Sequence, residues 1–111
     1  MTKTADDLVY EVAGLLGKAV EGEALGQIEY ETINGGIDNV LAEIREIVYV
    51  ADRDEIDERY FQTLARLLAV HSASKFANAP LNLDEVRQHE NRLRYLAARP
   101  PTYEDLRPDY F

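Results

Sequence analysis

The sequence has no cysteine, no long apolar run and only two histidines. Without cysteine, disulfides, thiolate nucleophiles and cysteine-ligated zinc sites are excluded. A membrane-spanning helix needs about 18 consecutive apolar residues, and no stretch of this chain approaches that length. The first residues also lack the basic-then-apolar profile of a secretion signal. We therefore expect a protein that is made in the cytoplasm and has no membrane partner.

Patterns of catalytic and metal-binding residues are missing as well. His71 and His89 fall in different expected helices, and neither belongs to a spacing typical of metal ligands. No serine or threonine lies in a nucleophile-elbow context. The Gly35-Gly36 pair is not followed by the Gly-Lys-Ser/Thr of a phosphate-binding loop. We predict that the protein is not an enzyme and has no catalytic residue, cofactor or metal.

Negative charge is abundant and unevenly distributed. The chain has 21 acidic and 12 basic residues, a formal net charge of −9. Residues 1–58 carry fifteen acids and four bases (net −11), whereas residues 59–111 carry six acids and eight bases (net +2). The acidic front half argues against ordinary binding to duplex DNA, which depends on Lys and Arg contacts to phosphate. Two interpretations stay open: a solvated acidic face, or a surface that repels nucleic acid or meets a basic partner.

The spacing of apolar residues predicts four helices. Thr4 caps the first, Asp7 completes its capping box, and Gly17 is its C-terminal stop. The third helix has the most continuous apolar stripe and spans about residues 58–77. The fourth begins at the capping residue Asn82, with a glutamate three residues later, and a proline pair stops it.

The second helix and the residues after it are harder to assign. The helix runs from about Glu29 to Glu46, and its apolar stripe keeps its phase across Gly35-Gly36. We therefore predict one continuous helix in which small residues permit close packing. Ile47-Val48-Tyr49-Val50 has the composition of a short strand. Such a strand must pair elsewhere in the chain or with a neighbouring subunit, and the charged loop Asp52 to Asp57 follows it.

The last twelve residues, Pro100 to Phe111, differ from the rest. Three prolines make a helix or a central strand unfavourable. The segment nevertheless has four large apolar side chains, and burying one of them is worth roughly 1.5–3 kcal/mol. We predict an arm that docks in a groove, on a partner or alternatively on its own helices. The docking residues are Pro100, Pro101, Thr102, Tyr103, Leu106, Pro108, Tyr110 and Phe111.

The expected fold is therefore mainly α: a four-helix domain over residues 1–99 with one short extended segment, followed by an extended C-terminal arm over residues 100–111. The order of elements includes a first helix with Leu-Leu-Gly, a glycine-rich loop, a long helix with Leu-Ala-x-Leu-Leu-Ala, and a last helix that leads into Pro-Thr-Tyr-Glu. This order resembles the head-to-tail connector (adaptor) proteins of tailed phages, particularly the podovirus-type tail accessory factors that stabilise packaged DNA. The resemblance covers about residues 5–111 and is most specific over residues 33–43, 60–77 and 109–111.

The resemblance implies a structural protein of the virion neck. Twelve copies would form a ring beneath the portal protein, extend the DNA channel and link the capsid to downstream tail or neck proteins after packaging. The arm would insert between portal subunits, and the loop with the extended segment would face tail proteins or a neighbour. DNA would pass through without sequence-specific binding, because an acidic lining repels phosphates. The candidate channel-facing or tail-facing acids are Glu21, Glu23, Glu29, Glu31, Asp52, Asp54 and Glu55.

Two other functions are compatible with the sequence. One is a small helical regulator or antitoxin whose C-terminal tail docks on a partner protein. The other is a helical DNA-binding module that uses Arg87, Arg92, Arg94 and Arg99. The negative net charge and the lack of a helix-turn-helix signature disfavour this second function.

Overall fold

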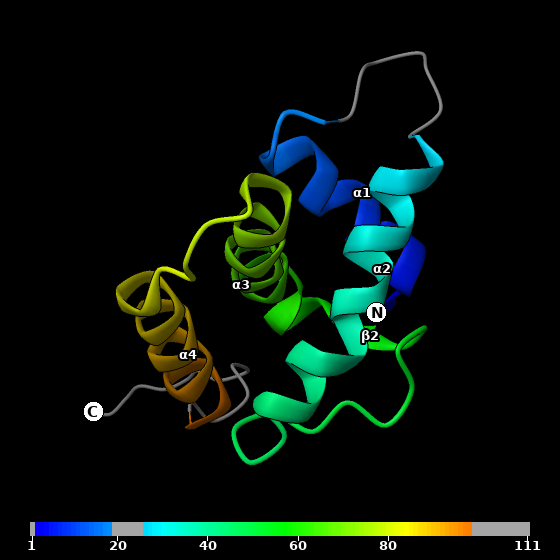
Figure 1. Ribbon diagram of the computed structural model, residues 1–111. Helices are drawn as coiled ribbons and strands as arrows, with labels where there is room; N and C mark the ends of the chain where they lie inside the picture. The colour runs from blue at the N-terminus through cyan, green and yellow to red at the C-terminus, as the bar shows by residue number, and fades with distance from the viewer. Residues whose placement is uncertain (1, 19–25, 99–111) are drawn as a thin grey trace, which may run out of the picture.

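The computed structural model describes residues 2–18 and 26–98 of the chain (Figure 1). Within these residues the elements follow the order β1 (Thr2–Lys3), α1 (Ala5–Leu15), α2 (Gln27–Glu43), β2 (Ile56–Asp57), α3 (Glu58–Ala77) and α4 (Leu83–Ala98). The mainly helical fold with four helices is therefore confirmed. The boundary between the domain and the predicted arm lies outside the described residues.

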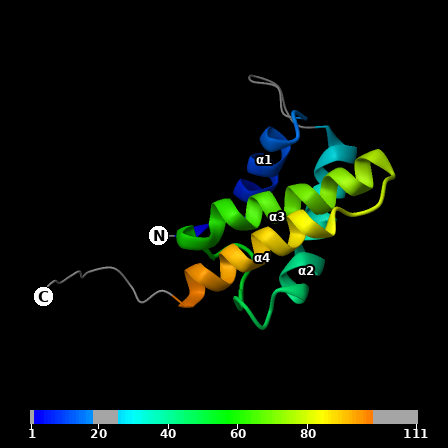
Figure 2. The same ribbon diagram turned by 90° about the vertical axis from the view of Figure 1, so that its left-hand side faces the viewer.

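Helix α3 is the central element of the fold. Helices α1 and α2 pack against each other and against α3, whereas α4 packs mainly against α3 (Figures 1 and 2). The α3 side chains Leu64, Leu67 and Leu68 are almost completely buried, and so are Ile37 of α2 and Leu93 of α4. Burying one such side chain contributes roughly 1.5–3 kcal/mol, so the contacts of α3 supply most of the packing that holds the helices together.

Both ends of α1 follow from local sequence. The Asp7 amide donates to the Thr4 hydroxyl at 3.1 Å, and the Thr4 amide donates to an Asp7 carboxylate oxygen at 3.0 Å. The hydrogen bond with the Thr4 amide lowers the pKa of Asp7. At the other end Gly17 has φ +71°, and the Lys18 amide donates to the Ala13 carbonyl at 2.8 Å. The capping box and the glycine stop are both confirmed.

Helix α2 is continuous across its two glycines, as predicted, although it begins and ends earlier than expected. Gly36 is buried, and a Cβ atom there would lie 3.3 Å from Leu68 Cδ1. A Cβ on Gly35 would meet nothing within 4 Å. Close packing of α2 on α3 therefore depends on Gly36 and not on Gly35.

The strand predicted over residues 47–50 is wrong. Ile47 lies in a turn after α2, and residues 48–50 have no regular secondary structure. The Val48 amide already donates to the Ile44 carbonyl at 2.9 Å, so the chain leaves α2 through a helical turn. The strands that form are β1 and β2, which pair antiparallel with Lys3 opposite Ile56. Such a short, non-local pair gives no signal in the local composition.

The C-terminal end of α3 and the start of α4 agree with the sequence. Asn78 adopts the left-handed conformation (φ 51°) and ends α3, and the Ala79 amide donates to the Ser74 carbonyl at 3.1 Å. The Glu85 amide donates to the Asn82 side-chain oxygen at 3.2 Å, so Asn82 caps α4. The proline pair that was expected to stop α4 lies outside the described residues.

Candidate functional site

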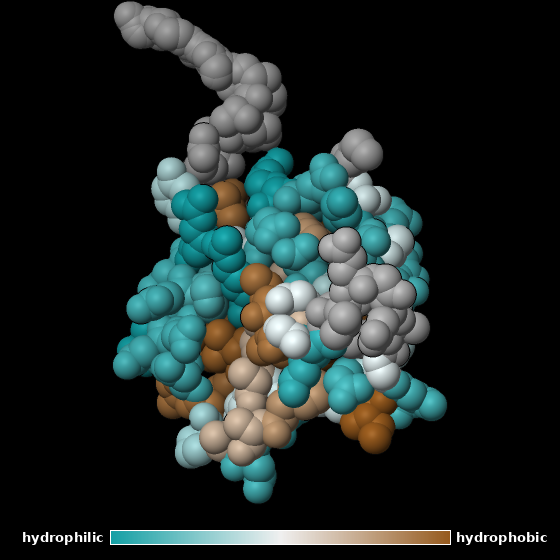
Figure 3. Space-filling view, turned by 90° about the horizontal axis from the view of Figure 1, so that it is seen from above, coloured by the Kyte–Doolittle hydropathy of each residue, from teal (hydrophilic) through white to brown (hydrophobic). Residues whose placement is uncertain are grey.

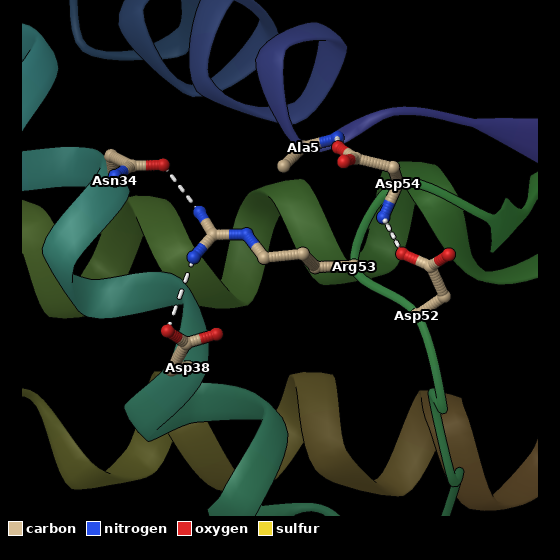
Figure 4. A network of polar contacts seen from close by, with 6 residues as sticks. All are labelled: Ala5, Asn34, Asp38, Asp52, Arg53 and Asp54. Carbon is tan, nitrogen blue, oxygen red and sulfur yellow. Dashed lines mark hydrogen bonds and ion pairs between the residues drawn. The ribbon is translucent and has the colours of Figure 1, made fainter.

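A loop after α2 is tied to that helix by one arginine. Arg53 forms an ion pair with Asp38 at 3.1 Å and donates a second hydrogen bond to the side-chain oxygen of Asn34 (Figure 4). Asn34 and Asp38 are four residues apart and therefore lie on one face of α2. The planar guanidinium can bind both at once, so Arg53 fastens the loop to the middle of the helix.

The residues beside Arg53 connect the same loop to α1. The Ala5 amide donates to Asp54 at 3.1 Å, and the Asp54 amide donates to Asp52 at 2.9 Å (Figure 4). The Ala5 amide is one of the first-turn donors that have no partner within the helix. A carboxylate at this position is also favoured by the helix dipole. Asp54 therefore stabilises the start of α1 although the residue itself is exposed to solvent.

A third polar contact joins α1 to α2. The Tyr30 hydroxyl donates to an Asp6 carboxylate oxygen. This hydrogen bond is the main reason that the pKa of Tyr30 is raised, with smaller contributions from burial and from the Asp6 charge. Tyr30 therefore stays protonated and keeps donating to Asp6 around neutral pH.

These contacts gather exposed carboxylates from three segments. Residues 26–57 contain nine acids but only two bases, Arg45 and Arg53. Arg53 is already paired with Asp38, so this part of the surface has a large excess of negative charge. We call it the acidic face; its exposed members are Asp6, Glu31, Asp38, Asp52, Asp54 and Glu55.

The predicted acids have different positions in the structure. Glu29 and Glu31 lie in the first turns of α2, where Glu31 accepts a hydrogen bond from Gln27 at 3.0 Å. Asp52 and Asp54, together with the exposed Glu55, belong to the loop of the acidic face. Glu21 and Glu23 lie outside the described residues.

Sequence reasoning missed two members of the acidic face, Asp6 and Asp38. Both residues fall within expected helices, where an exposed acid is common and does not indicate a functional site. The spacing of Asn34 and Asp38 was the available signal, because two hydrogen-bond acceptors four residues apart can share one arginine.

The predicted docking arm cannot be located in the same way. All eight of its residues lie outside the described part of the chain: Pro100, Pro101, Thr102, Tyr103, Leu106, Pro108, Tyr110 and Phe111.

Helices α3 and α4 carry a smaller share of acidic residues than the rest of the described chain. Helix α3 carries three bases and one acid, and α4 carries three of each. Arg87, Arg92 and Arg94 are exposed on α4, with the Arg92 guanidinium 5.2 Å from the centre of the Tyr95 ring. Because α4 packs mainly on α3, its balanced charges lie apart from the acids of the loop after α2. Arg99 lies outside the described residues.

The two histidines lie in separate places. His71 Nε2 is buried without a hydrogen-bond partner, 3.9 Å from a Glu43 carboxylate oxygen. Burial lowers the pKa of His89, which borders a hollow of about 500 Å³. Apolar side chains, including Leu16 and Val70, line much of this hollow. Seen from above, the surface has patches of apolar side chains among polar ones (Figure 3).

Two kinds of site are absent from residues 2–18 and 26–98. No group of three or more His, Asp or Glu side chains there is arranged to hold a metal ion. No helix in that part of the chain is long and apolar enough to cross a membrane.

Comparison with known proteins gives no relative: no protein-family model, no curated protein and no solved structure matches the chain. The class that the fold and the site define is a small, mainly helical protein with an exposed acidic face.

Proposed function

We propose that the protein is a structural head-to-tail adaptor of a tailed phage. In this role it forms a ring of twelve copies beneath the portal, extends the DNA channel and links the capsid to the tail after packaging. The observation that carries the proposal is the acidic face, taken together with the resemblance of the sequence to phage adaptors.

The acidic face suits a surface past which DNA moves. Duplex DNA carries about one negative charge per 1.7 Å of its axis, so exposed carboxylates repel it instead of holding it. Glu31, Asp52 and Glu55 are exposed on this face. The hydrogen bonds of Arg53 and Asp54 fix the loop in position, so the charge is presented by a stable surface. Packaged DNA would therefore slide without sequence-specific binding.

The docking arm would be separate from this surface. Residues 100–111 follow α4 in the chain, and α4 packs mainly on the side of α3 away from α2. One copy can then bind a groove between portal subunits through the arm while its acidic face remains free. Prolines reduce the entropy lost when the arm is ordered, and its aromatic side chains supply the buried area.

Co-expression with the portal protein of the same genome tests the proposal. We expect the full chain to co-purify with the portal and native mass spectrometry to show twelve added copies. Deletion of residues 100–111 should abolish this binding and leave the helical circular dichroism unchanged. A matched control changes only the charged arm residues Glu104 and Asp105 to Gln and Asn, and it should still bind.

The alternatives give different results in the same experiment. A regulator or antitoxin would ignore the portal and form a complex of one or two copies with another partner. Portal binding by the chain that lacks residues 100–111 would contradict the arm as the anchor.

A further inference from the structure

A histidine of α3 lies beside the last turn of α2 without a hydrogen bond to it. His71 Nε2 is buried, has no hydrogen-bond partner, and lies 3.9 Å from a carboxylate oxygen of Glu43. A hydrogen bond needs about 2.7–3.2 Å between its donor and its acceptor, so the two side chains are close but not bonded. A buried polar atom that stays unpaired destabilises the fold, so a bond between the two would be favourable.

The two side chains differ in their freedom to move. The side chain of His71 is 16% exposed, whereas that of Glu43 is 57% exposed. A glutamate with this exposure can change its rotamer at little cost, but a mostly buried ring is held by the packing around it. Glu43 is therefore the side chain that can move the remaining distance of about 1 Å.

The charge of the imidazole decides how strongly the two groups attract each other. An ordinary histidine is half-protonated near pH 6.5 and an ordinary glutamate near pH 4.3, so between these values the pair is a cation and an anion. A protonated imidazole donates from both of its nitrogens. A hydrogen bond between opposite charges is also about twice as strong as a neutral one. Mild acid therefore favours closure of the gap.

One other charge lies in the same place. Glu43 and His71 border a hollow of about 380 Å³ between α2 and α3, and the remaining charged side chain of its lining is Lys75. None of the described residues of α1 or α4 lines this hollow. Lys75 follows His71 by one turn of α3, so it opposes protonation of the imidazole and attracts the same carboxylate. Because Lys75 is exposed, water screens both effects.

The contact is placed where it can act on the end of a helix. Glu43 is the last residue of α2, and the chain continues from there into the loop of the acidic face. A positive charge near the C-terminus of a helix is also favoured by the helix dipole.

We propose that protonation of His71 closes a charged hydrogen bond to Glu43 and so fastens the C-terminal end of α2 to α3 in mildly acidic solution. The stabilisation is present while the imidazole is protonated and is lost as the pH rises through its titration. This pH-sensitive contact needs no arm, portal or DNA. It can therefore fail while the adaptor proposal succeeds, and the reverse also holds.

Urea denaturation of the full chain at about pH 8 and about pH 5.5 tests the contact. Relative to Glu43→Gln, the wild-type equilibrium constant for unfolding should fall about two- to fivefold more at the lower pH, the size expected for a partly exposed charge pair. Glu43 stays ionised at both pH values, so its interactions with Lys75 and with the helix dipole cancel. The titration of His89 is common to both proteins and cancels too.

Three further variants show whether the pH dependence belongs to this pair. In a His71→Gln background, Glu43→Gln should have the same effect at both pH values. Glu46→Gln is the matched control, because Glu46 is exposed and does not line the hollow. Its effect should not depend on pH. Lys75→Met removes the competing positive charge and should enlarge the pH-dependent effect of Glu43→Gln.

Amide exchange gives a local measurement that needs no substitution at His71. The amides of Ile44, Ile47 and Val48 donate within the turns that end α2. Their protection factors, corrected for the intrinsic pH dependence of exchange, should rise about two- to fivefold more in wild type than in Glu43→Gln between about pH 8 and about pH 5.5.

Four results would overturn the proposal. These are an effect of Glu43→Gln that is the same at both pH values, a pH-dependent effect that persists with His71→Gln, an equal effect of Glu46→Gln, and a smaller effect in the Lys75→Met background. If His71→Gln does not fold, the other three comparisons still decide the outcome, because they change exposed side chains.

Discussion

The two sides of the molecule are held together by different interactions. Around α3 the contacts are apolar, with Leu64, Leu67 and Leu68 buried against the other helices. Where the loop of residues 48–55 meets α1 and α2, the burial of Val48 is joined by polar contacts of Arg53 and Asp54. The first region therefore maintains the fold, whereas the second holds exposed charged side chains in position. Stability should therefore respond strongly to changes in the first region and weakly to changes in the second.

The largest effect is expected in the packed region. Leu67→Ala removes a side chain that is 0% exposed in the middle of α3 and should lower the free energy of unfolding by about 2–5 kcal/mol. Urea denaturation measures this loss. Arg66→Ala is the matched control, because the neighbouring arginine is exposed and its loss should change stability by no more than about 0.5 kcal/mol. Equal effects of the two substitutions would show that α3 is not the centre of the core.

A smaller effect is expected in the polar region. Arg53→Ala removes the contacts with Asp38 and Asn34, and it should cost about 1 kcal/mol because the ion pair is partly exposed. Thermal denaturation measures the stability, and amide exchange of residues 52–55 should become faster at the same time.

Arg53→Lys separates charge from geometry in this contact. Lysine keeps the positive charge but lacks the planar fork that reaches both α2 side chains, so the loss should be intermediate. If Arg53→Ala costs as much as Leu67→Ala, the distinction between a packed and a polar region is wrong.

The sequence predicts these regions unequally for a physical reason. The caps formed by Thr4 with Asp7 and by Asn82 with Glu85 connect residues three apart, so local spacing was enough to find them. The packing of Gly36 against α3 was anticipated because an apolar stripe continues across it.

Contacts between distant segments could not be read in the same way. Arg53 bonds to residues fifteen and nineteen positions away, and β1 pairs with β2 across most of the domain. Val48 to Val50 have the composition of a strand but belong to no strand of the described chain, because composition does not specify a pairing partner.

The smallest effect concerns the pH dependence of a single cap. The hydrogen bond with the Thr4 amide lowers the pKa of Asp7 below its ordinary value of 3.8. A carboxylate with a lowered pKa in the folded state stabilises the fold above the unfolded value, and this contribution is lost as the pH falls through the folded pKa. Wild-type protein should therefore be more stable than the Asp7→Asn variant near neutral pH, and the difference should shrink in acid.

Asp7→Asn is a well-matched substitution because the amide oxygen of asparagine can still accept from Thr4 but has no charge to lose. Comparing the free energies of unfolding of the two proteins from about pH 6 to about pH 2 cancels the titration of every other carboxylate that they share. Thr4→Ala keeps the backbone amide that lowers the pKa of Asp7 and removes only the hydroxyl, so most of the pH-dependent difference should remain in that background. If the difference in free energy of unfolding between the two proteins stays constant across this pH range, the charge of Asp7 does not stabilise the start of α1. The cap would then act through its hydrogen bonds alone.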